Sequence, residues 1–348
     1  MGQAPKTVQE TGEFGLIAEL AAALPEAARA GPDLRIGIGD DAAVWAPSAG
    51  EAVVVTTDSL VEGIHFRLDW TDWFSLGHKA LAVNLSDLAA MGAAPRLATV
   101  SLGLRGDEAL EDLRSLYRGL GALAARTGTR IAGGDIVRSP HGRVLHVTAL
   151  GETIRGRVLR RDGAQSGDLV TVSGTLGAAA AGMGLLAGEG DRAAATADLL
   201  VASHLRPEPR LALGRSLAEA GATAAMDLSD GLFGDLPKIL TASRVAARIE
   251  LGRLPVAAAV RALFPERWLE MATRGGEDYE LLFTVPPPRW ADIELAARSA
   301  GSTVTAIGEV VASTTDGPQL VICGVDGVER AAETGAFDHF MGGDMECG

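Results

Sequence analysis

The chain contains few lysines and few cysteines, and each scarcity excludes a class of site. Its only lysines are Lys6, Lys79 and Lys238, and none of them follows a glycine-rich run as the lysine of a Walker A loop does. If the protein uses ATP, it therefore holds the nucleotide without a P-loop. The two cysteines, Cys323 and Cys347, have neither the spacing of a zinc site nor that of a disulfide framework.

The chain also lacks a long apolar run and an excess of positive charge. No run approaches the roughly 20 apolar residues of a membrane-spanning helix, and residues 1–15 lack the basic and then apolar pattern of a signal peptide. The 45 acidic residues outnumber the 31 basic ones, and the net charge of −14 disfavours non-specific binding to nucleic acid or anionic lipid. We therefore expect a cytoplasmic enzyme without nucleic-acid or membrane partners.

The 348 residues suffice for two domains of ordinary size, and hydrophobic patterning predicts two α/β halves. Helices are expected at residues 13–30 (ended or kinked by Pro25), 75–91, 108–126, 178–187, 209–220 and after Asp230. Strands are expected at residues 34–38, 52–57, 97–104, 143–153, 169–173, 224–228, 279–285, 304–310 and 319–325. The basic, glycine-containing segment 155–168 suits a connection, so we predict domains at residues 1–155 and 156–348.

Five short motifs combine acids with glycines or with the ends of expected strands. They are residues 37–42 (GIGDDA), 56–66 (TTDSLVEGIHF), 84–87 (NLSD), 133–135 (GGD) and 227–231 (DLSDG). A single loop of this kind often does no more than form a turn. Five of them weaken that interpretation. Asp87 weakens it further, because it lies in a largely apolar amphipathic helix, where an unpartnered carboxylate is costly to bury.

The first motif matches the relaxed dinucleotide fingerprint G-x-G-x-x-G/A. That fingerprint places a pyrophosphate against backbone amides at the start of a helix. Asp40 and Asp41 would put negative charge at that point, and no convincing helix follows before Pro47. We reject the dinucleotide interpretation, because carboxylates in a glycine turn are better suited to hard cations.

The second motif has a structural alternative of its own. Asp58 and Ser59 could cap a following turn, but this does not account for Glu62 or His65. A lone histidine is more often a satisfied surface or core residue than a ligand contact. The spacing of His65 from Asp58 across a glycine leaves a substrate role open.

Many carboxylates and few lysines would repel phosphates unless metal ions intervene. Phosphoryl transfer depends mainly on positioning and on charge neutralisation by Mg²⁺, so carboxylates can act through the metals that they hold. A phosphate acceptor is already anionic and needs no general base, but it does need several cations. The residues therefore favour Mg²⁺-dependent phosphoryl transfer.

In this order and spacing, the motifs resemble those of the thiamine-monophosphate kinase family, within the ATP-binding superfamily named after aminoimidazole ribonucleotide synthetase. The likeness runs nearly end to end and is highly specific. It covers residues 12–17 (GEFGLI), 37–44 (GIGDDAAV), 56–66, 79–93 (KALAVNLSDLAAMGA), 133–135, 161–168 (RDGAQSGD), 204–209 (HLRPEP), 227–232 (DLSDGL), 275–283 (GGEDYELLF) and 337–340 (FDHF).

The resemblance implies a mixed α/β, two-domain PurM-like fold, a homodimer, and an N-terminal domain for ATP, Mg²⁺ and dimerisation. Family members transfer the γ-phosphate of ATP directly to thiamine monophosphate, with several Mg²⁺ ions in a groove between domains. The implied metal ligands are Asp41, Thr56, Thr57, Asp58, Asp87, Asp135, Asp227 and Asp230, of which Asp58 and Asp230 are the expected catalytic pair. The implied nucleotide contacts are Gly134, Asp135, Arg161, Ser229 and Tyr117, and the implied thiamine contacts are His65, Glu277 and Phe337. Asp40 would orient its neighbour.

Departures from the family pattern are few. Ser166 stands where a proline is common, and Phe337 stands where a larger or hydroxylated aromatic is frequent. Two alternatives stay open: a superfamily relative that activates another substrate with ATP, and a non-catalytic sensor of nucleotides or divalent ions. A selenophosphate synthetase would bring a reactive cysteine near its N-terminus, which this chain lacks. The full set of aspartates argues against a degenerate site.

Overall fold

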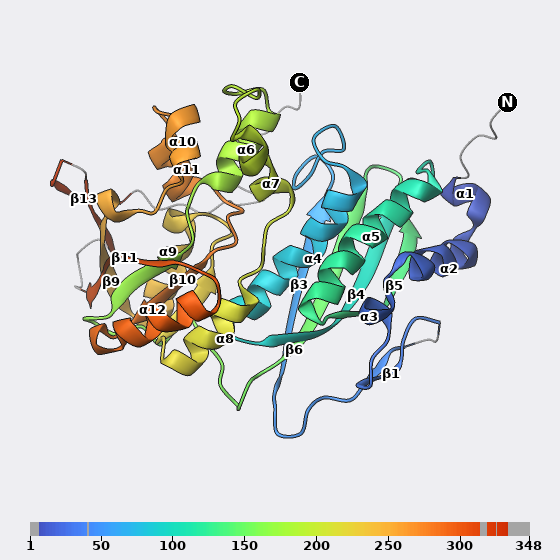
Figure 1. Ribbon diagram of the computed structural model, residues 1–348, viewed down its shortest axis with the longest axis horizontal. Helices are drawn as coiled ribbons and strands as arrows, with labels where there is room; N and C mark the ends of the chain where they lie inside the picture. Colours follow the sequence, from blue (N-terminus) through green and yellow to red (C-terminus); the bar gives the residue numbers. More distant parts are fainter. Residues whose placement is uncertain (1–6, 40–41, 314–318, 325, 333–348) are drawn as a thin grey trace. The chain divides into compact units, whose positions relative to one another are not determined.

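The computed structural model describes residues 7–39, 42–313, 319–324 and 326–332 (Figure 1). The chain divides into two compact units. The first unit runs to Val158 and also includes Leu205–Leu211, whereas the second contains Leu159–His204 and the chain from Ala212 onward. Each unit has its own hydrophobic core.

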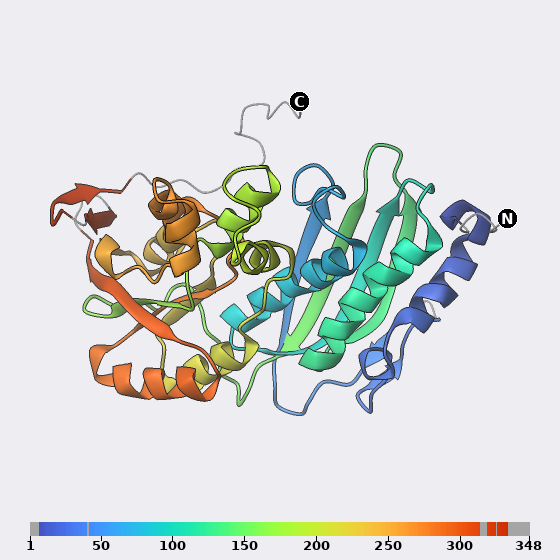
Figure 2. The ribbon, with the colours of Figure 1, turned by 45° about the horizontal axis from the view of Figure 1, so that its top comes forward.

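The first unit is a four-stranded sheet with helices packed on one face (Figure 2). The strand order is β3 (Val53–Val61), β6 (Val144–Glu152), β4 (Ala94–Leu104) and β5 (Arg130–Arg138). The β4–β5 pair is parallel and the other two pairs are antiparallel. The helices are α1 (Val8–Thr11), α2 (Glu13–Ala23), α3 (Glu26–Arg29), α4 (Trp73–Ala90) and α5 (Leu110–Thr127), and a short pair β1 (Leu34–Ile36) and β2 (Val44–Trp45) precedes the sheet.

Glycines allow α4 and α5 to pack closely. A Cβ atom on Gly77 would lie 1.9 Å from the carbonyl oxygen of Leu116, and one on Gly119 would lie 1.9 Å from that of Phe74. Asp72 fixes where α4 begins, because its Oδ1 accepts a hydrogen bond from the backbone N–H of Ser75 at 2.8 Å. The register of α4 against the sheet places Asp87 next to β3.

The second unit is built on a seven-stranded sheet within the described residues. The strand order is β13 (Glu329–Ala331), β12 (Leu320–Cys323), β9 (Val245–Glu250), β11 (Val304–Ala312), β7 (Leu169–Ser173), β10 (Leu281–Val285) and β8 (Ala224–Asp227). Only the β12–β9 pair is parallel among these. The α-helices are α6 (Ala178–Leu186), α7 (Ala197–Leu205), α8 (Leu211–Ala220), α9 (Leu232–Ser243), α10 (Ala258–Leu263), α11 (Trp268–Arg274) and α12 (Trp290–Ser299).

Most expected elements are found within a few residues of their predicted ends, and β7 is found at the predicted residues. Pro25 does interrupt the first helical segment, because it lies between α2 and α3. The expectation that the acids stand on loops is wrong for Asp58 and Asp135, which lie inside β3 and β5. Strand β3 continues past Asp58 to Val61 because it keeps pairing with β6, and β5 continues past its two glycines to Arg138 because it keeps pairing with β4. Among the described residues, no helix is long and apolar enough to cross a membrane.

Candidate functional site

In the first unit, two predicted metal ligands of β3 face a third on α4. Side chains alternate between the two faces of a strand, so Thr56 and Asp58 point to the same side. The Thr56 hydroxyl donates a hydrogen bond to Oδ2 of Asp87. This contact places a hydroxyl and two carboxylates beside one another, and such oxygens are the ligands that Mg²⁺ prefers.

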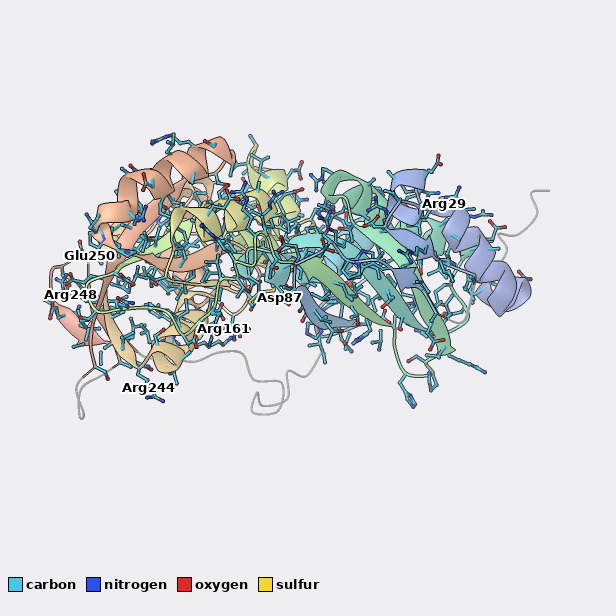
Figure 3. All side chains as sticks on the ribbon, turned by 90° about the horizontal axis from the view of Figure 1, so that it is seen from below. Arg29, Asp87, Arg161, Arg244, Arg248 and Glu250 are labelled. Atoms are coloured by element: carbon cyan, nitrogen blue, oxygen red, sulfur yellow. The ribbon has the colours of Figure 1, made fainter. Side chains whose placement is uncertain are left out.

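The surroundings of Asp58 in this cluster disfavour its ionised form. Burial and, second, the negative charge of Asp87 raise the pKa of Asp58 to about 6. Two carboxylates that disfavour each other's ionised form would both be stabilised as anions by a bound cation. Figure 3 labels Asp87 on its helix.

The structure does not bring Thr57 to this cluster. Its hydroxyl lies on the opposite face of β3, 2.9 Å from Nε2 of His146 and 3.0 Å from the hydroxyl of Thr148. Nδ1 of the same histidine lies 2.7 Å from the Ser59 hydroxyl. A metal contact of the Thr57 side chain stays a prediction, and the alternation of the strand separates it from Asp58.

Gly134 and Asp135 lie on β5, at the opposite edge of the sheet from β3. The strands β6 and β4 separate the two edges, so these residues do not join Asp58 within one chain. A Cβ atom at position 134 would lie 1.9 Å from the carbonyl oxygen of Val100, so any larger residue would push β5 away from β4. Asp135 is exposed.

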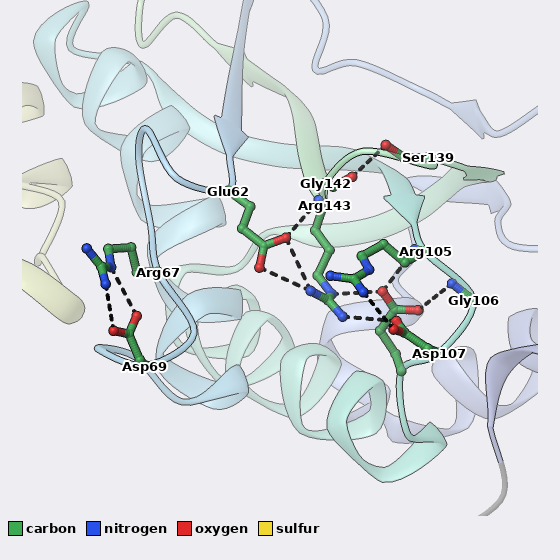
Figure 4. Close-up of polar contacts among 10 residues, drawn as sticks. Glu62, Arg67, Asp69, Arg105, Gly106, Asp107, Ser139, Gly142 and Arg143 are labelled. Atoms are coloured by element: carbon green, nitrogen blue, oxygen red, sulfur yellow. Dashed lines mark hydrogen bonds and ion pairs between the residues drawn. The ribbon is translucent and has the colours of Figure 1, made fainter. Parts of the chain in front are cut away.

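The loop that follows β3 carries His65 and is held by an arginine. Arg143 contacts Glu62 at 3.0 Å, Glu108 at 2.8 Å and Asp107 at 3.2 Å (Figure 4). Nδ1 of His65 accepts a hydrogen bond from the Val61 N–H at 3.1 Å. The neutral imidazole therefore carries its proton on Nε2, which makes Nε2 a donor.

Tyr117, a predicted nucleotide contact, lies in the hydrophobic core of the first unit. Its side chain on α5 is only 7% exposed, and burial raises the pKa of its phenol. Its role in nucleotide binding stays a prediction.

In the second unit, the 227–231 loop is paired with the 275–280 segment. The N–H of Glu277 donates to the carbonyl of Ser229 at 2.8 Å, and the N–H of Tyr279 donates to that of Leu228 at 2.9 Å. A Cβ atom on Gly276 would lie 2.5 Å from the Ser229 carbonyl oxygen, so only glycine permits this approach.

The same segment contains two non-glycine residues with left-handed backbone. The φ angles are 66° at Glu277 and 50° at Tyr279. Such conformations are costly and gather at functional sites. Between them, the Asp278 carboxylate accepts hydrogen bonds from the N–H groups of Gly177 at 2.6 Å and Ala179 at 3.1 Å, where α6 begins. The segment is thereby anchored on both sides.

Glu277, a predicted thiamine contact, has a histidine partner that the sequence did not reveal. Nδ1 of the buried His204 lies 2.9 Å from Oε2 of Glu277. His204 belongs to the HLRPEP segment, so the family motif was the one available signal for it.

Asp230 lies in a small charged network at the start of α9. Nζ of Lys238 lies 2.6 Å from Oδ2 of Asp230 and 2.8 Å from Oδ1 of Asp235. Oδ2 of Asp235 accepts hydrogen bonds from the N–H groups of Ser229 and Asp230, both at 2.9 Å. Sequence reasoning missed Asp235 and Lys238, although their spacing of three residues on a helix was a signal.

For two of the remaining predicted residues, the structure gives a position in the fold. Asp227 ends β8 and is buried, and Arg161 is exposed, with its carbonyl accepting a hydrogen bond from the Ser243 hydroxyl at 2.8 Å (Figure 3). Asp40, Asp41 and Phe337 lie outside the described residues.

No group of three or more His, Cys, Asp or Glu side chains that could hold a metal occurs among the described residues. Pairs of carboxylates are nonetheless compatible with Mg²⁺. This ion usually keeps several waters and binds through one or two carboxylates plus substrate phosphates.

Comparison with known proteins relates both units to one superfamily. The family described as AIR synthase related protein, N-terminal domain, matches residues 39–153, and the corresponding C-terminal domain matches residues 165–320. The thiamine-monophosphate kinase of Escherichia coli O157:H7 is 40% identical over 333 residues, which cover 94% of this chain and 98% of that protein.

Two solved structures are similar over nearly the whole chain. A thiamine-monophosphate kinase from Stenotrophomonas maltophilia K279a has 39% identity and a TM-score of 0.80, covering 95% of this chain and all of that one. A structure described as AaThiL complexed with AMPPCP and TMP has 32% identity and a TM-score of 0.74, covering 97% of this chain and all of that one. The chain therefore belongs to the thiamine-monophosphate kinase family, and its two units have the PurM-like fold of that family.

Proposed function

We propose that this protein transfers the γ-phosphate of ATP directly to the phosphate of thiamine monophosphate and so forms thiamine diphosphate in the cytoplasm. The observation that carries the proposal is the similarity, over 97% of this chain, to a relative described as complexed with AMPPCP and TMP. AMPPCP is an ATP analogue that cannot donate its γ-phosphate, so that complex contains both a donor analogue and an acceptor.

Mg²⁺ is part of this proposal. In the first unit, Thr56, Asp58 and Asp87 supply hydroxyl and carboxylate oxygens, and in the second unit Asp227 and Asp230 supply carboxylates. When bound, Mg²⁺ would neutralise the phosphate oxygens of donor and acceptor. The chain's own contribution is to hold these oxygens in place and to present His65 and Glu277 to the thiamine portion.

We also propose a homodimer, because the described residues place helices on only one face of the first unit's sheet. Three valines on the described strands of this sheet are strongly exposed: Val53 at 44%, Val55 at 60% and Val137 at 54%. The outer edges of β3 and β5 have no strand partner among the described residues. Proteins normally cover long edge strands, and a second copy would cover both edges and the valines.

This dimer would also bring the separated predicted ligands together. Because β3 and β5 are opposite edges of one sheet, a second copy that pairs its β5 with β3 brings the strand that carries Gly134 and Asp135 next to the strand that carries Asp58. Co-expression of Asp58→Asn chains with Asp135→Asn chains then restores about a quarter of the wild-type activity, since half of the dimers are mixed and each has one intact site. Asp58→Asn chains paired with Asp87→Asn chains serve as the control and recover nothing. Recovery in the control, or none in the test, contradicts the shared site.

One assay tests the reaction itself. The purified protein is incubated with ATP, Mg²⁺ and thiamine monophosphate, and the products are separated by chromatography. We expect thiamine diphosphate and ADP in equal amounts. Phosphorylation of free thiamine alone, or no product, would remove the substrate assignment.

A further inference from the structure

The lysine of the second unit has no part in the motifs that define the family resemblance. Lys238 is one of only three lysines in the chain, and it lies on α9 eight residues after Asp230. Its side chain is 35% exposed, and its Nζ contacts two carboxylates. Because the chain has so few lysines, a lysine beside a predicted phosphate-transfer site is of interest.

Asp235 fixes both the loop and the lysine. Its carboxylate is fully buried: one oxygen accepts the N–H groups of Ser229 and Asp230, and the other accepts Nζ of Lys238. A buried carboxylate with three donors has little freedom to rotate. Asp235 thereby sets the position of the loop backbone and of the ammonium group at the same time.

The ammonium group lies on one oxygen of a predicted metal ligand. Nζ contacts Oδ2 of Asp230 at 2.6 Å, which leaves Oδ1 as the oxygen not engaged by Lys238. A positive charge at this distance repels a bare divalent cation and attracts phosphate. The ammonium group of Lys238 therefore disfavours binding of the divalent cation and favours binding of the nucleotide phosphates.

We propose that Lys238, held by Asp235, is a positioning residue that orients Asp230 and makes cation binding at the 227–231 loop depend on nucleotide phosphates. The inference rests on the proposed function, because it assigns Asp230 to a divalent ion and the loop to a nucleotide. Without nucleotide, the lysine supplies the positive charge at Asp230. With nucleotide, the same charge contributes to the neutralisation of phosphate.

The test is a titration of the full-length, metal-free protein with Mn²⁺, followed by electron paramagnetic resonance, with and without AMPPCP. It is made in the Asp58→Asn background, so that the first-unit cluster contributes less. We expect Lys238→Gln to bind Mn²⁺ alone about tenfold more tightly and to bind AMPPCP in the presence of Mn²⁺ about tenfold more weakly. Lys238→Arg keeps the charge and retains both affinities within about threefold.

A purely structural lysine gives a different pattern. If Lys238 only maintained the fold of the loop, Lys238→Gln would weaken both ligands and lower the melting temperature, and this result would overturn the inference. Unchanged affinities would overturn it as well. If Lys238→Gln does not fold, the double variant Lys238→Gln/Asp235→Asn removes the buried charge and is titrated instead.

Two controls separate this result from others. Arg298→Gln removes a positive charge from the exposed surface of α12 and should change neither affinity. The titrations require no turnover, so failure of the proposed kinase reaction would appear as absence of thiamine diphosphate with the wild-type protein, independently of the Mn²⁺ curves.

Discussion

The two predicted metal-binding clusters differ in how their negative charge is balanced. In the first unit, Asp58 and Asp87 lie together, and the pKa of Asp58 is raised to about 6 by burial and by its neighbour. In the second unit, Asp230 and Asp235 share the ammonium group of Lys238. The first cluster thus contains a carboxylate whose ionised form is disfavoured by its surroundings, whereas the second contains two carboxylates that share one lysine ammonium group.

A third cluster of acids, in the first unit, surrounds Arg143. Arg143 neutralises Glu62 and Glu108, and stacks over Trp73 with its guanidinium carbon 5.7 Å from the ring centroid. This arginine is largely buried and is a permanent partner, because guanidinium stays charged at any relevant pH. Acids with a permanent cation are suited to hold structure, whereas an acid whose ionised form is disfavoured, as that of Asp58 is, is suited to bind an ion that arrives with substrate.

The largest expected effect is on the cluster of Asp58 and Asp87. Asp58→Asn should reduce kcat by about 1000-fold or more, because a neutral amide is a poor ligand for Mg²⁺ and the phosphate charge would be left uncompensated. Steady-state assays with ATP and thiamine monophosphate measure the loss. The melting temperature should not fall, since the variant removes an unfavourable buried charge. Near-normal activity would take Asp58 out of the metal set.

The next effect is on stability and concerns the cluster with a permanent cation. Arg143→Met should lower the free energy of unfolding by about 3 kcal/mol, because Glu108 is buried and would lose its charged partner. Urea unfolding measures this change. Arg67→Met is the matched control: its partner Asp69 is exposed, at 2.8 Å, so the loss should be under about 1 kcal/mol (Figure 4). Equal losses of unfolding free energy in the two variants would contradict the expectation that the buried ion pair contributes more than the exposed one.

The smallest effect is the pH dependence of the first cluster without metal. The pKa of Asp58 is raised from 3.8 to about 6, so the folded state binds more protons than the unfolded state between these pH values. The contribution of Asp58 to stability therefore falls as pH rises from about 4 to about 6, by roughly 2 kcal/mol. Unfolding in the presence of a chelator should show this slope in the wild type and a shallower one in Asp58→Asn. Identical slopes would contradict the raised pKa.

The sequence predicted the fold class and the motif positions because both depend on local patterns. The apolar run of β7 and the break at Pro25 are examples, since neither requires knowledge of distant residues. The opposite-edge positions of Asp58 and Asp135 were not predictable in this way, because strand order is set by long-range pairing.

The same limit applies to single side chains. The burial of Tyr117 depends on how α5 packs, and the partnership of Glu277 with His204 joins segments more than seventy residues apart. Lys238 was noted only as not belonging to a P-loop. Its position beside Asp230 depends on α9, which carries the lysine back to the loop that precedes the helix.

The segment Leu205–Leu211 belongs to the first unit although both of its neighbours along the chain belong to the second. Nε2 of His78 contacts the Pro207 carbonyl at 2.9 Å, and Arg126 contacts Glu208 at the same distance, so the segment is bound there by its own contacts. The backbone consequently passes between the units three times. A protease that cuts after Val158 breaks the only covalent link between residues 1–158 and the rest of the chain, and the contacts of Leu205–Leu211 within the first unit then hold the two fragments together. A gene truncated near residue 158 would encode a first unit without this segment.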